Sequence, residues 1–267
     1  MGNADATAAA GQSDLLKIEQ KGAVLTVGLN RPAKRNALND GIILAIQDCF
    51  SNLPEGIGAV VIHGVGDHFS SGLDLSELTE HDATEGLRHS QMWHRVFDRI
   101  QYSRVPVIAA LKGAVIGGGL ELACAAHIRV AEPSAYFALP EGQRGIFVGG
   151  GGSVRLPRLI GVARMVDMML TGRVYSATEG SSYGFSQYLT DEAGALPKAL
   201  ELAERVAANA PLTNFAVLQA LPMIAEANPQ TGLLMESLMA TVAQSDKEAK
   251  RRIRAFLDHK TAKVKPT

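Results

Sequence analysis

The sequence predicts an α/β fold that is rich in strands in its first half and helical at its end. Short apolar, β-branched runs recur up to about residue 140, whereas three later runs carry apolar residues at helical spacing. The chain has 267 residues, of which 46% are hydrophobic and 20% charged, and it is long enough for one large core or two domains.

A hairpin and an amphipathic helix are the first predicted elements. Residues 15–30 hold two β-rich runs around Lys21-Gly22, and residues 39–51 carry apolar side chains at helical spacing. Beyond them the pattern predicts a buried strand at 59–63, a polar helical stretch at 76–104 with Trp93 and Phe97 on one face, and a buried strand from 105 that turns at Lys112-Gly113.

The first of two glycine clusters, Gly117 to Gly119, opens the helical run LELACAA. Glycines at a helix N-terminus let a ligand approach unpaired N–H groups, which is favourable for an oxyanion. Glu121 lies in the first turn of this apolar helix, where an ionised carboxylate is costly to bury unless it is hydrogen-bonded or functional. A carboxylate that caps the helix is the other interpretation of Glu121.

A second acid, Glu141, follows the apolar run 135–139. Because Pro140 keeps the chain from continuing as a central strand, we expect Glu141 at a strand end or in a loop. The second glycine cluster, 149–152, precedes an expected helix, and by itself it fits close backbone packing at a turn. The stretch lacks both the G-x-G-x-x-G dinucleotide pattern and a phosphate loop of the G-x-x-x-x-G-K-[ST] type.

The last part of the chain is predicted to be helical at 197–208, 212–225 and 232–262, and Pro222 should kink or shorten the second helix. Arg155 and Arg158 resemble helix-surface or interface groups. The expected organisation is a loose N-terminal segment at 1–14, a core with the active site at 15–195 and a helical region at 196–267.

These segments resemble the crotonase superfamily, the enoyl-CoA hydratases and isomerases. GGGLELA and FALPE look like two characteristic family segments, and the acids stand 20 positions apart, as in the hydratases. The likeness runs from about Leu16 to Lys260. It implies a spiral of ββα repeats followed by a helical trimerisation region.

The resemblance also implies a hydro-lyase that adds water to an enoyl-CoA. Glu121 would activate the attacking water, and Glu141 would be the general acid/base at the α carbon. FSSGLDL resembles the family's F-x-x-G-x-D segment, so the backbone N–H groups of Leu73 and Gly118 are the expected oxyanion hole. The Gly149 N–H is expected to orient the water.

Two departures from the family pattern are notable. Val148 stands where many hydratases have proline, which should loosen the turn and affect substrate preference. His127 stands where many have aspartate; it ends the helix that bears Glu121, where a histidine is favourable with the helix dipole.

Coenzyme A is expected only as part of the substrate, with no separate cofactor and no metal. LNRPAKRNAL resembles the family's first coenzyme A contact, and the basic C-terminal helix resembles the one that closes over coenzyme A, with His259 replacing the usual lysine. From the residues alone, a solvated loop and a solvated helix face stay open for these segments. The predicted coenzyme A contacts are Lys34, Arg35, Ala37, Ser71, Asp74, Leu75, Phe256 and Lys260.

Three segments together, LELACAAH, PEGQRGIFVGGGGS and FSSGLDLSEL, resemble the methylthioacryloyl-CoA hydratases of bacterial dimethylsulfoniopropionate breakdown. This likeness implies release of methanethiol and then thioester hydrolysis to acetaldehyde, CO2 and CoA, with Glu141 as nucleophile or base. The alternatives are a general enoyl-CoA hydratase of fatty-acid or amino-acid catabolism, an acyl-CoA hydrolase, a noncatalytic crotonase-like scaffold and an RNA-binding member. The intact acids and glycines disfavour the scaffold, and the acidic start of 76–104 disfavours RNA binding.

Composition narrows the remaining possibilities. The net charge of −1 argues against a dedicated nucleic-acid binder. Cys49 and Cys124 fit no metal spacing and are expected to be reduced, buried thiols of a cytoplasmic protein. Neither a signal peptide nor a membrane span is predicted. The family resemblance implies a homotrimer or a hexamer made of two trimers.

Overall fold

The computed structural model describes residues 14–77 and 82–258. The expected loose segment at 1–14 therefore lies, except for Asp14, outside the described residues, as does Lys260. The strands are β1 Leu16–Lys21, β2 Val24–Leu29, β3 Ala59–Gly64, β4 Val107–Leu111, β5 Ala114–Ile116, β6 Ile128–Ala131, β7 Tyr136–Ala138, β8 Tyr175–Ser176 and β9 Tyr188–Leu189.

The rest of the regular structure consists of α-helices and four short helical turns, three of them 3₁₀-helical and one π-helical. The α-helices are α1 Asp40–Ser51, α2 Ala83–Gln101, α3 Gly118–Ala125, α4 Gly152–Ile160, α5 Val162–Thr171, α6 Ala177–Tyr183, α7 Ala195–Ala207, α8 Pro211–Phe215, α9 Leu221–Glu226, α10 Pro229–Ser245 and α11 Lys247–Leu257. The short turns are η1 Pro32–Lys34, η2 Leu75–Glu77, η3 Gly142–Arg144 and the π-helical η4 Ala216–Ala220. None of the helices within 14–77 and 82–258 is long and apolar enough to cross a membrane.

The predicted N-terminal hairpin and the helix after it are confirmed. β1 and β2 pair antiparallel from Leu16↔Leu29 to Lys21↔Val24, and Gly22 takes the positive φ of 58° that the tight turn requires. α1 begins at Asp40 because the Asn39 side chain accepts a hydrogen bond from the Ile42 N–H.

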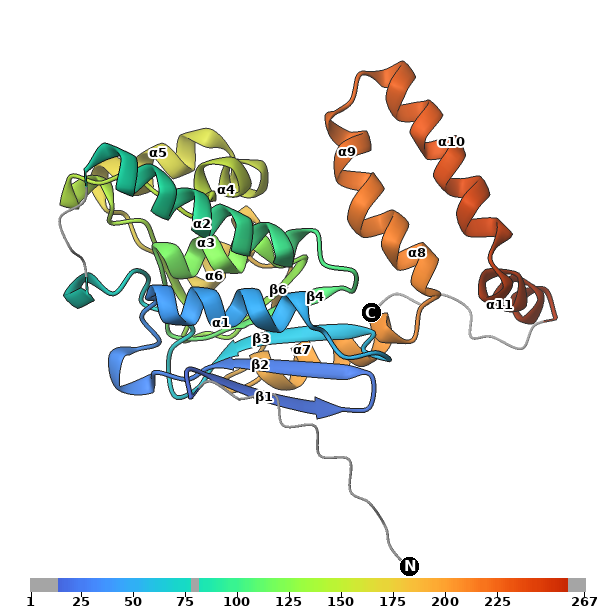
Figure 1. Cartoon of the computed structure of the whole chain (residues 1–267), viewed down its shortest axis with the longest axis horizontal. Helices are drawn as coiled ribbons and strands as arrows, with labels where there is room; N and C mark the ends of the chain where they lie inside the picture. Colours follow the sequence, from blue (N-terminus) through green and yellow to red (C-terminus); the bar gives the residue numbers. More distant parts are fainter. Residues whose placement is uncertain (1–13, 78–81, 259–267) are drawn as a thin grey trace, which may run out of the picture.

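The larger sheet has the order β1-β2-β3-β4-β6-β9, and from β2 onward its neighbours run parallel. α1 and α2 are the crossovers that lead into β3 and β4 (Figure 1). After β4 the chain turns at Gly113, whose φ is 52°, and enters a second sheet of order β5-β7-β8. The predicted turn at Lys112-Gly113 thus moves the chain from one sheet to the other, which places α3 between the two sheets.

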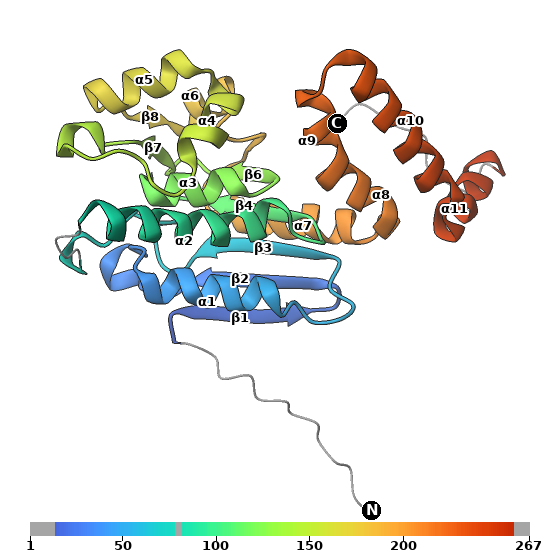
Figure 2. The same ribbon diagram turned by 45° about the horizontal axis from the view of Figure 1, so that its top comes forward.

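Alternate residues of the parallel strands pack into two apolar layers. Val60 and Ile62 of β3 pack with the α1 and α2 side chains, whereas Ala59 and Val61 pack with α7 on the other face. Figure 2 shows α1 and α2 on one side of the sheet. α7 begins at Ala195, and its apolar side chains pack on the sheet, so this helix is joined to the core.

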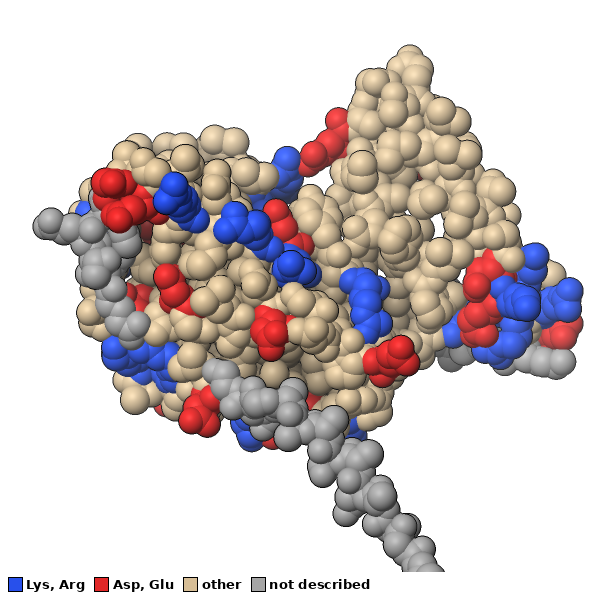
Figure 3. Space-filling model, in the orientation of Figure 1, with Lys and Arg blue, Asp and Glu red and all other residues tan. Residues whose placement is uncertain are grey.

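The helices after α7 extend away from the core (Figure 1). The prediction of one helix over 232–262 is wrong, because α10 ends at Ser245 and α11 begins at Lys247. Asp246 separates them: its side chain accepts the N–H groups of Glu248 and Ala249 and so starts a new helix. Pro222 lies in the first turn of α9, directly after the π-helical turn, which confirms the predicted interruption. Lys and Arg gather on α11 (Figure 3).

Candidate active site

One cavity of about 390 Å³ brings both predicted acids and both predicted oxyanion donors together. Glu121, Glu141, Leu73, Gly118 and Gly149 all line it. The elements that meet there are α2, α3, the loop before η2 and the segment from Glu141 to Gly150. Apolar side chains form much of the remaining wall: Leu75, Trp93, Ile116, Ile146, Phe147 and Val148.

Glu121 is buried in the first turn of α3, with 4% of its surface exposed. Its Oε1 accepts two backbone hydrogen bonds from the second glycine cluster, from Gly150 N at 2.9 Å and from Gly152 N at 2.7 Å. Burial raises the pKa of Glu121, and the N–H groups of the glycine turn, followed by the charge of Arg155, oppose this increase. The carboxylate is thus held in one orientation by groups that favour its ionised form, and the interpretation as a mere helix cap is wrong.

Glu141 stands at the end of β7, after Pro140, as the sequence predicted. Burial raises its pKa to about 7, and the nearby charge of Glu121 acts in the same direction. Its Oε2 is buried and has no hydrogen-bond partner among the described residues. At neutral pH this carboxyl group is therefore protonated in about half of the molecules.

Each glycine cluster makes room for the carboxylate of the other segment. A Cβ on Gly117 would lie 2.5 Å from Glu141 Oε1, and a Cβ on Gly152 would lie 2.7 Å from Glu121 Cγ. Both approaches are closer than carbon–carbon or carbon–oxygen contacts allow. Glycine is therefore required at these two positions by the acids themselves.

The two predicted oxyanion donors belong to neighbouring segments. The loop of Leu73 is fixed beside Leu38, because Leu38 N donates to Gly72 O at 2.7 Å and Asp74 N donates to Leu38 O at 2.8 Å. A Cβ on Gly72 would lie 3.3 Å from Gly118 N, so the loop runs directly along the start of α3. Among the described residues, no acceptor is found for the N–H of Leu73 or of Gly118. Two such N–H groups, on residues that line one cavity, suit a developing enolate oxygen.

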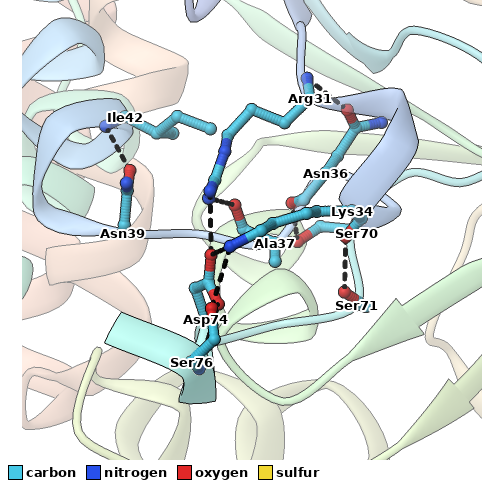
Figure 4. Close-up of polar contacts among 10 residues, drawn as sticks. All are labelled: Arg31, Lys34, Asn36, Ala37, Asn39, Ile42, Ser70, Ser71, Asp74 and Ser76. Carbon is cyan, nitrogen blue, oxygen red and sulfur yellow. Dashed lines mark hydrogen bonds and ion pairs between the residues drawn. The ribbon is translucent and has the colours of Figure 1, made fainter. Parts of the chain in front are cut away.

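An ion cluster supports this loop from outside the cavity (Figure 4). Asp74 Oδ2 lies 2.8 Å from Arg31 Nη2 and 3.0 Å from Lys34 Nζ, and Asp74 Oδ1 accepts the Ser76 hydroxyl at 2.6 Å. Hydrogen bonds from Ser76, Lys34 and Arg31 hold the pKa of Asp74 far below its usual range. Arg31 lies in the segment LNRPAKRNAL, but the sequence pattern does not indicate its role, because nothing local shows that its partner lies 43 residues away.

The other predicted coenzyme A contacts are only partly brought together. Ser71 N donates to Arg35 O at 2.9 Å, and the Ala37 carbonyl accepts from Arg31, so the contacts predicted in the segments 34–37 and 71–75 lie together. Of these residues, Ser71 and Leu75 line the cavity. Phe256 lies on α11, which is distant from this surface in the same chain (Figure 1). The structure therefore assembles Lys34, Arg35, Ala37, Ser71, Asp74 and Leu75, but not Phe256.

The charge interpretation of His127 is wrong. α3 ends at Ala125, and the His127 ring bridges two other elements: Nδ1 accepts the Val107 N–H at 2.9 Å, and Nε2 lies 2.9 Å from Gln101 O. Burial lowers the pKa of His127, so it is a neutral side chain that joins β4 to α2, and it does not line the cavity.

Arg155 is also not the surface group that the sequence indicated. It is buried, with 8% of its surface exposed, whereas Arg158 is exposed and pairs with Glu226 at 2.6 Å. Helical spacing alone does not distinguish Arg155 from Arg158, because the difference in their burial comes from contacts with segments that are distant in sequence.

Val148 is buried in the cavity wall, and the turn after it is fixed by Ser90, whose hydroxyl donates to Gly149 O at 2.7 Å.

Comparisons with known proteins point to one family. The sequence model of the "Enoyl-CoA hydratase/isomerase" family matches residues 19–266. A Bacillus subtilis protein named "Probable enoyl-CoA hydratase" is 34% identical and the match covers 94% of this chain and 97% of that protein. The Escherichia coli 2,3-dehydroadipyl-CoA hydratase is 33% identical, over 94% of this chain and 98% of its own.

Solved structures agree with this result. A Rhodopseudomonas palustris protein provisionally assigned as an enoyl-CoA hydratase is 80% identical, with a TM-score of 0.91 over 94% of this chain and 97% of its own. An enoyl-CoA hydratase from Bacillus anthracis, 29% identical, superimposes with a TM-score of 0.86 over 92% of this chain and 96% of its own. The predicted spiral core with C-terminal helices is confirmed.

Proposed function

This chain belongs to the enoyl-CoA hydratase/isomerase family, and we propose that it adds water across the double bond of a short α,β-unsaturated acyl-CoA thioester. The observation that carries the proposal is one small cavity lined by two buried carboxyl groups and two backbone N–H donors. A water held within reach of both acids can give its oxygen to the β carbon while the α carbon receives a proton.

The surroundings of the two acids suit two different roles. Glu121 accepts N–H groups that favour its ionised form, so it takes a proton from the attacking water. Glu141, with a pKa of about 7 and an oxygen without a partner among the described residues, carries the proton that goes to the α carbon. The N–H groups of Leu73 and Gly118 stabilise the enolate oxygen that forms between these steps. Two acids at one site favour hydration over double-bond migration.

The cavity favours a short, apolar acyl group. Its volume of about 390 Å³ is at the small end of the range for ligand sites, and Leu73, Trp93 and Val148 line it. We propose methylthioacryloyl-CoA as the substrate, because a thioether packs favourably against an aromatic ring such as that of Trp93. Water addition at its β carbon gives a hemithioacetal, which expels methanethiol and leaves an aldehyde; hydrolysis of the thioester would then release coenzyme A and, after loss of CO2, acetaldehyde.

We also propose that the active protein is a trimer or a pair of trimers and needs no cofactor beyond the coenzyme A of its substrate. Phe256 stands away from the cavity of its own chain, so it would reach coenzyme A only at a neighbouring subunit. Apolar side chains left exposed on α9 and α10 support self-association: Leu221, Met223, Leu233, Leu234 and Leu238. Light scattering after size-exclusion chromatography tests the assembly, and a monomer at assay concentration would contradict it.

Product analysis with two substrates tests the chemistry. The purified protein is incubated with crotonyl-CoA and, separately, with methylthioacryloyl-CoA, and methanethiol, free coenzyme A and the 3-hydroxyacyl product are followed together. Methanethiol with free coenzyme A supports the sulfur-specific reaction with hydrolysis. Only 3-hydroxybutyryl-CoA from crotonyl-CoA means a general hydratase, and no product from either substrate overturns the proposed function.

A further inference from the structure

The glycine turn that holds Glu121 is itself fastened from its far side by one buried side chain. Arg155 Nη1 donates to Gly150 O at 3.0 Å, and Gly150 is the residue whose N–H binds Glu121 Oε1. The same guanidinium reaches α2, where Nη2 lies 2.5 Å from Asp98 Oδ1 and Nε donates to Gln101 Oε1 at 2.6 Å. Arg155 thus connects the turn, α4 and α2 at one point.

The arginine occupies a confined position. Its side chain is 7% exposed, and a Cβ on Gly151 would meet the guanidinium, so the turn lies against it without space between them. A planar guanidinium makes several hydrogen bonds in a fixed geometry, which an ammonium cannot reproduce. Movement of Arg155 would therefore displace Gly150 O, which belongs to the same residue as the N–H that binds Glu121.

Arg155 also contributes charge. His89 of α2 and Arg144 of η3 line the same cavity as Glu121. The titratable groups that interact with Glu121 are Glu141 across the cavity, Cys124 one turn along α3 and Arg155 from α4; the pKa of Cys124 is raised to about 11, so its thiol is neutral. His94 and Asp98 of α2 lie on the outer side of the turn, at Gly151 and at Arg155. Arg155 is thus the one cation among the described groups that opposes the raised pKa of Glu121.

We propose that Arg155 is a positioning residue for the hydration reaction: by bonding Gly150 O, Asp98 and Gln101, it holds the glycine turn so that two N–H groups aim Glu121 at the attacking water. This inference rests on the proposed function. It assigns no contact with substrate to Arg155, which acts only through the turn.

Arg155→Gln tests the proposal, with Arg158→Gln as the matched control on the exposed face of the same helix. In Arg155→Gln, we expect kcat for crotonyl-CoA to fall about 10- to 100-fold while KM changes little, since a small misplacement of a catalytic group is enough for such a loss. The acidic limb of the kcat/KM profile should move to higher pH, because Glu121 must be ionised and has lost a nearby positive charge. Arg155→Lys should restore the position of that limb but not the full kcat. A profile for Arg155→Gln that matches Arg158→Gln overturns the proposal.

A measurement that does not depend on turnover separates this inference from the proposed function. Carbon-13 NMR of the carboxyl groups follows the titration of Glu121 in the full-length wild type and in Arg155→Gln. The titration midpoint of Glu121 should rise in the variant, and an unchanged midpoint overturns the positioning role whatever the substrate is. If Arg155→Gln does not fold, Gln101→Met gives the decision, because Gln101 Oε1 accepts the Arg155 Nε–H at 2.6 Å and its replacement loosens Arg155 without changing any charge. That variant should shift the midpoint in the same direction by a smaller amount, and no shift there also overturns the proposal.

Discussion

Replacement of Gly152 by alanine is expected to disable the site without unfolding the protein. Gly152 is the first residue of α4, its N–H donates to Glu121 Oε1, and its φ is not positive, so alanine is compatible with the backbone. The added Cβ would lie 2.7 Å from Glu121 Cγ and 2.9 Å from Oε1. The atoms in its way belong to a side chain, so the carboxylate moves and the backbone stays.

The size of the effect follows from these distances. Carbon atoms are in contact at about 3.5–4.0 Å, so Glu121 Cγ, at 2.7 Å from the new Cβ, must retreat by about 1 Å. A misplacement of about 1 Å in a catalytic group costs on the order of 100-fold in rate. Overpacking costs about 1–3 kcal/mol of stability, and the better helix propensity of alanine returns up to about 1 kcal/mol. The remaining loss of stability should leave the protein folded under assay conditions, whereas a fall in kcat on the order of 100-fold is readily measured.

Ser153→Ala, at the next residue of α4, is the control. Ser153 is exposed and is not among the residues that line the cavity. Steady-state hydration of crotonyl-CoA and thermal unfolding are measured for both variants. We expect Ser153→Ala to stay within about threefold of wild type in kcat. Wild-type kcat in Gly152→Ala, or equal losses in the two variants, would refute the account of the glycine turn.

Three further predictions concern the charged groups. Glu141 has a pKa of about 7 in the folded protein and 4.5 as an ordinary glutamate, so the folded state binds more protons between these two pH values and loses stability as the pH rises through them. Glu141→Gln should therefore abolish hydration and raise Tm at pH 8, but should not raise Tm at pH 4. The wild-type kcat/KM should fall above about pH 7, because Glu141 must be protonated. Glu121→Ala and Glu141→Ala should each nearly abolish hydration and leave coenzyme A binding intact by calorimetry; wild-type-like turnover in either would remove that acid from the mechanism. Asp74→Asn should cost about 1–3 kcal/mol in urea unfolding, because the partly buried Arg31 loses its carboxylate partner, whereas Glu19→Gln at the exposed pair with Lys17 should leave the urea midpoint unchanged.

Local patterns were sufficient for the elements that a short stretch of sequence specifies. The hairpin at 15–30 and the helix after Asn39 formed as predicted, because alternation, helical spacing and a capping residue act within a few positions. The break at Asp246 is also a local signal, since aspartate is a preferred N-cap, but the apolar spacing on both sides concealed it. The family segments indicated Glu121, Glu141, Leu73 and Gly118, and these four residues line one cavity.

The tertiary structure decided what those residues do to one another. The N–H groups of Gly150 and Gly152 bind Glu121, which lies 29 and 31 positions earlier in the sequence. Gly117 of the first glycine cluster leaves the space that the Glu141 carboxylate occupies. Burial lowers the pKa of His127 and keeps it neutral. Arg155 is buried and Arg158 is exposed, although the two arginines stand three residues apart on one helix. Sequence by itself determined which chemical groups are available and which stretches form most of the strands and helices. Only the folded chain determined their protonation and orientation, because both depend on solvent exclusion and on partners that are distant in sequence.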